Sequence, residues 1–135
     1  MLVRRHKHEA VALSDGRVLI AGGADERDGH GVYDSTELFD RKAGTFTAGP
    51  RMKLPRYKHC GSAVLLPNGD VLLAGGAPQA ELYDPTHNVF SIVPGDARMA
   101  GQFSASAPLP SGGVLITGGY GNSGGPRASA WRYAP

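Results

Sequence analysis

Apolar residues gather in short runs separated by turn residues, and the same arrangement occurs three times. The ungapped segments are AVALSDGRVLIAGG at 10–23, AVLLPNGDVLLAGG at 63–76 and SAPLPSGGVLITGG at 106–119. Each turn ends in Asp-Gly, Asn-Gly or Ser-Gly, which predicts a β-hairpin with a tight turn of the primed type, because such residues tolerate positive φ. The run after the turn is almost wholly apolar, so we expect a strand buried on both faces.

Each of these runs ends in two glycines. A strand that passes close to another backbone, or turns sharply, has no room there for a Cβ, and we expect this to be their role. A phosphate-binding loop is not favoured, because neither Lys-Ser/Thr nor a helical pattern follows the glycines. The pairs are Gly22 and Gly23, Gly75 and Gly76, and Gly118 and Gly119.

Two further strands are expected after the hairpin of each of the first two units, and one after the hairpin of the third. The third strand is predicted at ELFD, ELYDP and WRYAP, and the fourth at GTFTAGP and NVFSIVP. Their aromatic residues share a register and are expected to pack between neighbouring sheets. These residues are Phe39, Tyr83 and Tyr133 in the third strand, and Phe46 and Phe90 in the fourth.

The first strand of each of the first two units is expected to contain a histidine. The segments MLVRRHKH at 1–8 and MKLPRYKH at 52–59 both place Arg four residues after Met and His three residues after Arg. A third copy starting at Met99 keeps only the Met. The chain is therefore expected to be one domain of three units, at about 1–51, about 52–98 and, incomplete, about 99–135. Repeats of this length with four strands are typical of propeller blades.

The ordered elements resemble kelch repeats, most closely the bacterial form: R-x-x-H, then A-x-L-x-D/N-G-x-V-L-x-x-G-G, then E-L-Y-D-P and a later aromatic residue. The third unit departs from the pattern with Trp131 in place of Glu and Ala134 in place of Asp. The resemblance implies an all-β fold, a partial kelch-type β-propeller of two complete four-stranded antiparallel blades plus most of a third. It also implies blade-end loops that bind a protein partner or a polar ligand.

Because propellers typically have four to eight blades, the chain is interpreted as a segment of a larger propeller. Self-association of two or more copies to complete a ring is the alternative. An open arc exposes the apolar faces of its end blades, so the isolated protein is expected to dimerise or aggregate.

Arg5 with His8, and Arg56 with His59, are the repeated polar residues. They would either bind an anion or polar ligand at the channel, or hydrogen-bond turns and carboxylates such as Glu37 and Glu81 and so lock neighbouring blades together. The structural role is favoured, because scaffold contacts recur with the scaffold, whereas a binding site is usually built once.

No catalytic, metal or cofactor site is predicted. His6 and His8 would share one face of a strand, and His30 and His59 are the remaining candidates near them, but no third ligand is evident. Alternation would bury Cys60 as a small apolar residue. A galactose-oxidase-like copper radical enzyme stays as the alternative, without a motif that places a tyrosine beside Cys60. The 24–34 loop is interpreted as a solvated turn more than as a recognition loop.

Composition further limits the class of protein to which the chain can belong. Hydrophobic residues make up 41% and charged residues 19%, which fits a folded protein, and the net charge of +2 gives no argument for nucleic acid. The single cysteine excludes an internal disulfide. No run of about 20 apolar residues suggests a membrane span and the N-terminus lacks a secretory signal pattern, so the compartment is left unassigned. The function expected is a non-enzymatic scaffold or binding module.

Overall fold

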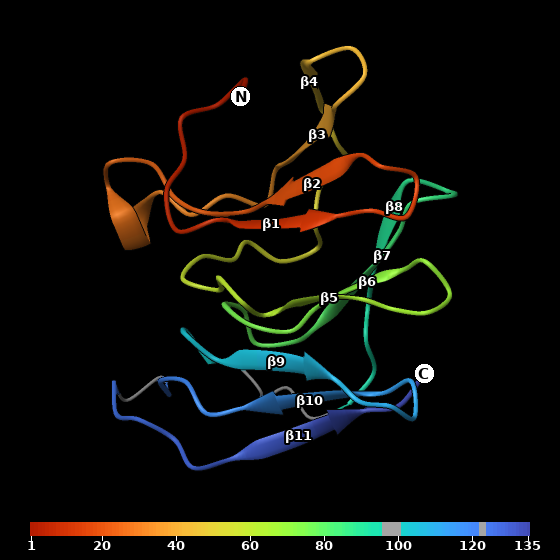
Figure 1. Ribbon diagram of the computed structural model, residues 1–135. Coiled ribbons are helices and arrows are strands. Elements are labelled where there is room, and N and C mark those ends of the chain that lie inside the picture. Colours follow the sequence, from red (N-terminus) through yellow and green to blue (C-terminus); the bar gives the residue numbers. More distant parts are fainter. Residues whose placement is uncertain (96–100, 122–123) are drawn as a thin grey trace.

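The computed structural model describes residues 1–95, 101–121 and 124–135, and these residues form an all-β structure. Eleven strands make three antiparallel sheets, and the short 3-10 turn η1 at Asp28–His30 interrupts one loop. The sheets lie one above another, with the sheet of β1–β4 and the sheet of β9–β11 at opposite ends of an open stack (Figure 1). No helix of the described residues is long and apolar enough to cross a membrane.

The strand order is β1-β2-β3-β4 in the first sheet, β5-β6-β7-β8 in the second and β11-β10-β9 in the third. The first strands β1, β5 and β9 lie next to one another along one side of the stack (Figure 1). The bounds are Glu9–Ala12, Val18–Ala21, Thr36–Asp40 and Thr45–Ala48 for β1–β4; Ala63–Leu65, Val71–Leu73, Glu81–Asp84 and Val89–Ile92 for β5–β8; and Ala105–Pro108, Val114–Thr117 and Ala130–Tyr133 for β9–β11.

Register makes the three sheets directly comparable. Val18 of β2 lies opposite Phe39, Val71 of β6 opposite Tyr83, and Val114 of β10 opposite Tyr133. The predicted units are therefore seen as successive sheets, while the segment around Met99 lies outside the described residues.

The hairpin turns differ from the predicted primed type. The amide of Gly69 donates to the carbonyl of Leu66, and the amide of Leu66 to the carbonyl of Asp70, which defines a type I turn followed by a left-handed glycine. Only the glycine takes a positive φ, +93°. Pro67 favours the observed turn, because its φ near −65° suits the first central position of a type I turn, and the first sheet makes the same turn with Ser14 at that position.

The first strands also start later than expected. His8 precedes β1 and His59 lies four residues before β5, so neither histidine belongs to a strand. Lys7 and Lys58 have φ of +56° and +54°, which ends any extended conformation just before each histidine. The prediction that His6 and His8 share one strand face is therefore wrong.

Burial on both faces is confirmed for β2 and β6 but not for β10. Leu72 of β6 is fully buried, whereas its counterpart Leu115 in β10 is 37% exposed. The third sheet has a described neighbour on one face only. Its outer face also carries Thr117 and Arg132 at the register positions of Ala74 and Leu82.

The predicted packing of aromatic residues between neighbouring sheets is confirmed for the pair of the second sheet. Tyr83 and Phe90 are buried with ring centroids 4.9 Å apart. They belong to a core cluster with residues of the first sheet such as Leu19 and Leu38. The equivalent pair in the first sheet, Phe39 with Phe46, has centroids 4.8 Å apart but remains half-buried.

Candidate functional site

Two arginines that precede the first strands of their sheets are buried on glutamates of the third strands. Arg5 Nη2 lies 3.1 Å from Glu37 Oε1, and Arg56 Nη2 lies 2.9 Å from Glu81 Oε1. Both side chains of each pair are almost completely buried. The contact with Glu37 and Glu81 that the sequence suggests is therefore present in both sheets, but each ion pair lies within one sheet and does not join neighbouring sheets.

Backbone groups complete each pair. Arg56 also donates to the carbonyls of Gly75 and Gln79, at 2.7 and 3.1 Å, and Glu81 accepts the amides of Lys53 and Leu54. Each charge thus has several hydrogen bonds, while the Nε atoms of Arg5 and Arg56 are buried without a hydrogen-bond partner among the described residues. The network ties the segment before β5 to the third strand of the same sheet.

Glu37 of the first sheet is bonded in the same way as Glu81, by two backbone amides and one arginine. Burial raises the pKa of its carboxyl, but the amides of Leu2 and Val3 and the guanidinium of Arg5 together hold the pKa below its usual value. The carboxylate therefore stays ionised within the sheet at neutral pH.

The third sheet replaces both members of the pair. The amide of Phe103 donates to the carbonyl of Lys58, as that of Lys58 does to Lys7, and all three residues have a positive φ. This register puts Gly101 where Arg56 stands, and the strand pairing puts Trp131 where Glu81 stands. Losing both charges together avoids an unpaired buried ion, which is the costly intermediate.

His59 links the first two sheets. Its ring Nε2 lies 3.2 Å from the carbonyl oxygen of Ala21 in β2, and the residue is fully buried. Burial, followed by the nearby Arg56 charge, lowers the pKa of His59 to about 3. The equivalent His8 is half-buried, and burial followed by Arg5 also lowers its pKa. Both imidazoles are therefore neutral at neutral pH.

The low pKa of His59 predicts that the stability of the protein depends on pH, and replacing His59 by serine should remove this dependence. In the unfolded chain the His59 imidazole binds a proton near pH 6.5, whereas in the folded protein it stays neutral down to about pH 3. The free energy of unfolding should therefore fall as the pH drops through this range. Between pH 6.5 and 5 the loss is about 2 kcal/mol. Serine occupies the equivalent position in the third sheet, Ser104. In His59→Ser, the free energy of unfolding measured with urea should therefore change much less over that pH interval.

The control is His87→Ser. His87 is exposed beside Asp84, which raises its pKa, so its removal should leave the acid slope in place. An unchanged slope in His59→Ser would contradict the buried neutral imidazole.

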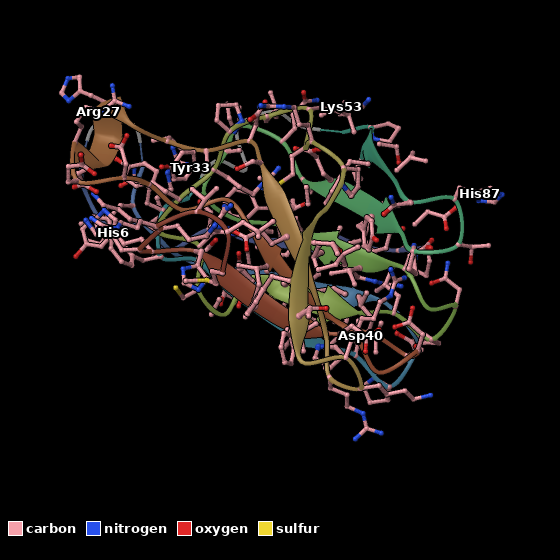
Figure 2. All side chains as sticks on the ribbon, turned by 90° about the horizontal axis from the view of Figure 1, so that it is seen from above. His6, Arg27, Tyr33, Asp40, Lys53 and His87 are labelled. Carbon is pink, nitrogen blue, oxygen red and sulfur yellow. The ribbon has the colours of Figure 1, made fainter. Side chains whose placement is uncertain are left out.

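His6 and the long loop lie at one end of the sheets. Figure 2 shows His6 and Arg27 at the end opposite Asp40 and His87. His6 Nε2 lies 2.8 Å from the carbonyl oxygen of Asp25, and Lys7 forms an ion pair of 2.7 Å with Asp28. Among residues 1–95, 101–121 and 124–135, no three His, Cys, Asp or Glu side chains are grouped to hold a metal.

Cys60 is exposed, so its predicted burial is wrong. The strand alternation assumed for it fails because Lys58 breaks the extended backbone two residues earlier. Its thiol donates to the carbonyl of His8 at 3.0 Å, and partial burial, followed by the Glu9 charge, raises its pKa. A raised pKa is the opposite of what an activated thiolate needs.

A cavity at this end was not predicted. We call this end, which carries the segments before β1, β5 and β9 and after β2, β6 and β10, the loop end. The cavity is about 730 Å³, and residues of the second and third sheets line it. The principal side chains are Lys58, Gln102, Phe103 and Tyr120.

The side chains of the loop-end cavity combine exposed rings with one cation. Phe103 and Tyr120 are 56% and 47% exposed and meet edge to face, with centroids 5.9 Å apart. Lys58 Nζ lies 4.8 Å from the ring centroid of Tyr57, and the hydroxyl of Tyr57 accepts a 3.2 Å hydrogen bond from Gln102. Such a surface offers apolar contact and a positive charge side by side.

Phe103 is unusual in its backbone as well. Its φ is +58°, which is rare for an aromatic residue, and Phe103 shares this conformation with Lys7 and Lys58 because the backbone there repeats from sheet to sheet. The sequence signal was the change from Lys7 and Lys58 to Phe103 at one register position. That register becomes visible only through the hydrogen bonds between sheets.

The sequence has no match among models of known protein families, and a search of curated proteins finds no similar chain.

Proposed function

We propose that the chain is a non-enzymatic binding module of kelch type, whose three sheets are propeller blades and which belongs to a larger propeller or completes one by assembly. The support is the threefold register of hairpin, double glycine and aromatic strand, together with first strands that lie side by side. In each repeated Arg–Glu pair the two side chains bond to each other and to backbone groups of their own sheet, which supports a structural role for them.

The ligand site of this module is the loop-end cavity. The observation that carries it is the exposed pair of Phe103 and Tyr120 beside Lys58. A matching ligand presents a flat or aliphatic face to the two rings and an anion or hydrogen-bond acceptor to the ammonium group.

Selection of peptides from a displayed library against the purified chain tests this function. Chosen peptides should bind about tenfold more weakly to Phe103→Asn and to Lys58→Asn, a loss of about 1.4 kcal/mol. Asparagine is suitable because it tolerates the positive φ at both positions. Val89→Ala, at an exposed apolar residue of β8 outside the cavity, is the matched control and should bind normally.

Affinities that stay unchanged in both variants would show that the loop-end cavity is not the ligand site. Turnover of a specific substrate by this chain would overturn the non-enzymatic assignment itself.

A further inference from the structure

Tyr57 lies against the Lys58 ammonium group of the loop-end cavity without lining the cavity itself. Its ring centroid is 4.8 Å from Lys58 Nζ, and its hydroxyl accepts the 3.2 Å hydrogen bond from the Gln102 side chain. Lys58 lines the cavity from the second sheet and Gln102 from the third. Tyr57 therefore contacts one polar side chain of the cavity from each of the two sheets.

The equivalent lysine of the first sheet is held in a different way. Lys7 has the same register and nearly the same φ as Lys58, and its ammonium group forms an ion pair of 2.7 Å with Asp28. No hydrogen bond or ion pair joins Lys58 Nζ to another described residue, and the groups that lie against it are the rings of Tyr57 and Phe103. The Lys58 ammonium group thus keeps its hydrogen-bond donors for a ligand, while aromatic rings hold it in place.

The 24–34 loop of the first sheet also reaches Tyr57. Gly29 belongs to the 3-10 turn η1 of this loop, and a Cβ at this position would lie 3.0 Å from the hydroxyl oxygen of Tyr57. The ion pair of Asp28 with Lys7 anchors the turn on the first sheet. The loop and the Tyr57 hydroxyl are therefore in direct contact, and neither can shift toward the other without moving it.

We propose that Tyr57 is the positioning residue of the loop-end cavity, and that the 24–34 loop acts on the affinity of the cavity through the Tyr57 hydroxyl. The ring holds the Lys58 ammonium group where a ligand anion meets it, and the hydroxyl holds Gln102. A shift of the hydroxyl turns the ring, so a change in the first sheet alters a site that the second and third sheets form. The effect on binding rests on the proposed function, whereas the position of Lys58 can be measured in the free chain.

Nuclear magnetic resonance of the free chain measures where the Lys58 ammonium group lies. The chain has four lysines, so their Hε resonances can be separated. Protons above the face of an aromatic ring are shifted upfield, and the Hε resonances of Lys58 should therefore lie upfield of those of the exposed Lys42. Tyr57→Leu, which removes the ring, should move them toward the Lys42 position and weaken the binding of library-selected peptides about fivefold.

Gly29→Ala tests the action of the loop. The backbone at Gly29 accepts alanine, because its φ is not left-handed, but the methyl group crowds the Tyr57 hydroxyl. This variant should shift the Lys58 Hε resonances and weaken peptide binding about threefold. Tyr57→Phe removes the crowded oxygen, so Gly29→Ala should have no further effect in that background. His30→Ala, at an exposed residue of the same turn, is the matched control and should change neither measurement.

Lys58 Hε resonances that stay in place in both Tyr57→Leu and Gly29→Ala would overturn the proposal. An effect of Gly29→Ala that persists in the Tyr57→Phe background would also overturn it, because the hydroxyl would then not carry the effect. Selected peptides that need Lys58 but bind normally to Tyr57→Leu would leave the proposed function intact and contradict the role of Tyr57. If the resonances move as expected but no selected peptide needs Lys58 or Phe103, the proposed function fails while the positioning of Lys58 by Tyr57 stands.

Discussion

Replacing Arg56 by methionine is expected to lower the free energy of unfolding by about 3–5 kcal/mol, because it leaves the Glu81 carboxylate buried without its cation. Arg56 and Glu81 have no exposed side-chain surface, so water does not replace the lost partner. The loss should appear as a shift of the urea midpoint with an unchanged slope.

A double-mutant cycle separates the ion pair from its surroundings. Glu81→Leu should also destabilise, and the combination with Arg56→Met should cost about 2 kcal/mol less than the sum, because no unpaired charge remains. The joint replacement of the two positions by Gly101 and Trp131 in the third sheet shows that a sheet forms without them. Strict additivity would mean that the two side chains do not depend on each other.

Arg27→Met provides the control. Arg27 also pairs with a carboxylate, that of Asp25, but its side chain is 66% exposed. Solvent screens such pairs, so the urea midpoint should stay near that of the unmodified chain.

Replacing Gly76 by alanine should destabilise the protein by about 3 kcal/mol or more, because the methyl group meets backbone in a conformation that already disfavours it. Gly76 has φ of +75°, and a Cβ there would lie 2.5 Å from the carbonyl oxygen of Tyr57. Tyr57 immediately precedes Lys58 of the loop-end cavity, so any relief of the clash moves that segment. Thermal unfolding would measure the loss.

Gly44→Ala separates steric contact from backbone strain. Gly44 has φ of +68°, but nothing lies within 4 Å of the place that a methyl group would take, so only the strain of about 1 kcal/mol applies. Equal losses in the two variants would show that close approach is not the reason for glycine at position 76.

The glycine pairs show what local sequence can reveal. Their predicted reason was close approach to another backbone, and the second glycine of each pair meets this condition. A Cβ at Gly23 would lie 2.6 Å from the carbonyl oxygen of His6, and one at Gly119 would lie 2.7 Å from that of Gln102. The requirement was predictable because glycine is the one residue that such a site accepts.

The turns and Cys60 show where local prediction failed for physical reasons. Asp-Gly and Asn-Gly suggested primed turns, but the turns start one residue earlier, at Leu13 and Leu66, so that each glycine follows the two central residues of a type I turn. Cys60 was assigned by strand alternation in a segment that is not a strand. A left-handed lysine carries no sequence signal of its own, so nothing marked Lys58 as the point where alternation stops.

The loop-end cavity was beyond sequence reasoning. Phe103 and Tyr120 meet within the third sheet, and only the stacking of the second and third sheets brings Tyr57 to Gln102 beside them.

Taken alone, the sequence determined the strands, their order within each unit and the positions where glycine or an aromatic residue is required. These follow from residue type and from a period of two, which act over a few neighbouring residues. The tertiary structure decided which charges pair, which faces are covered and where cavities remain. Those properties depend on contacts between residues far apart in the chain, whose free energy comes from burial between stacked sheets and leaves no mark in any single segment.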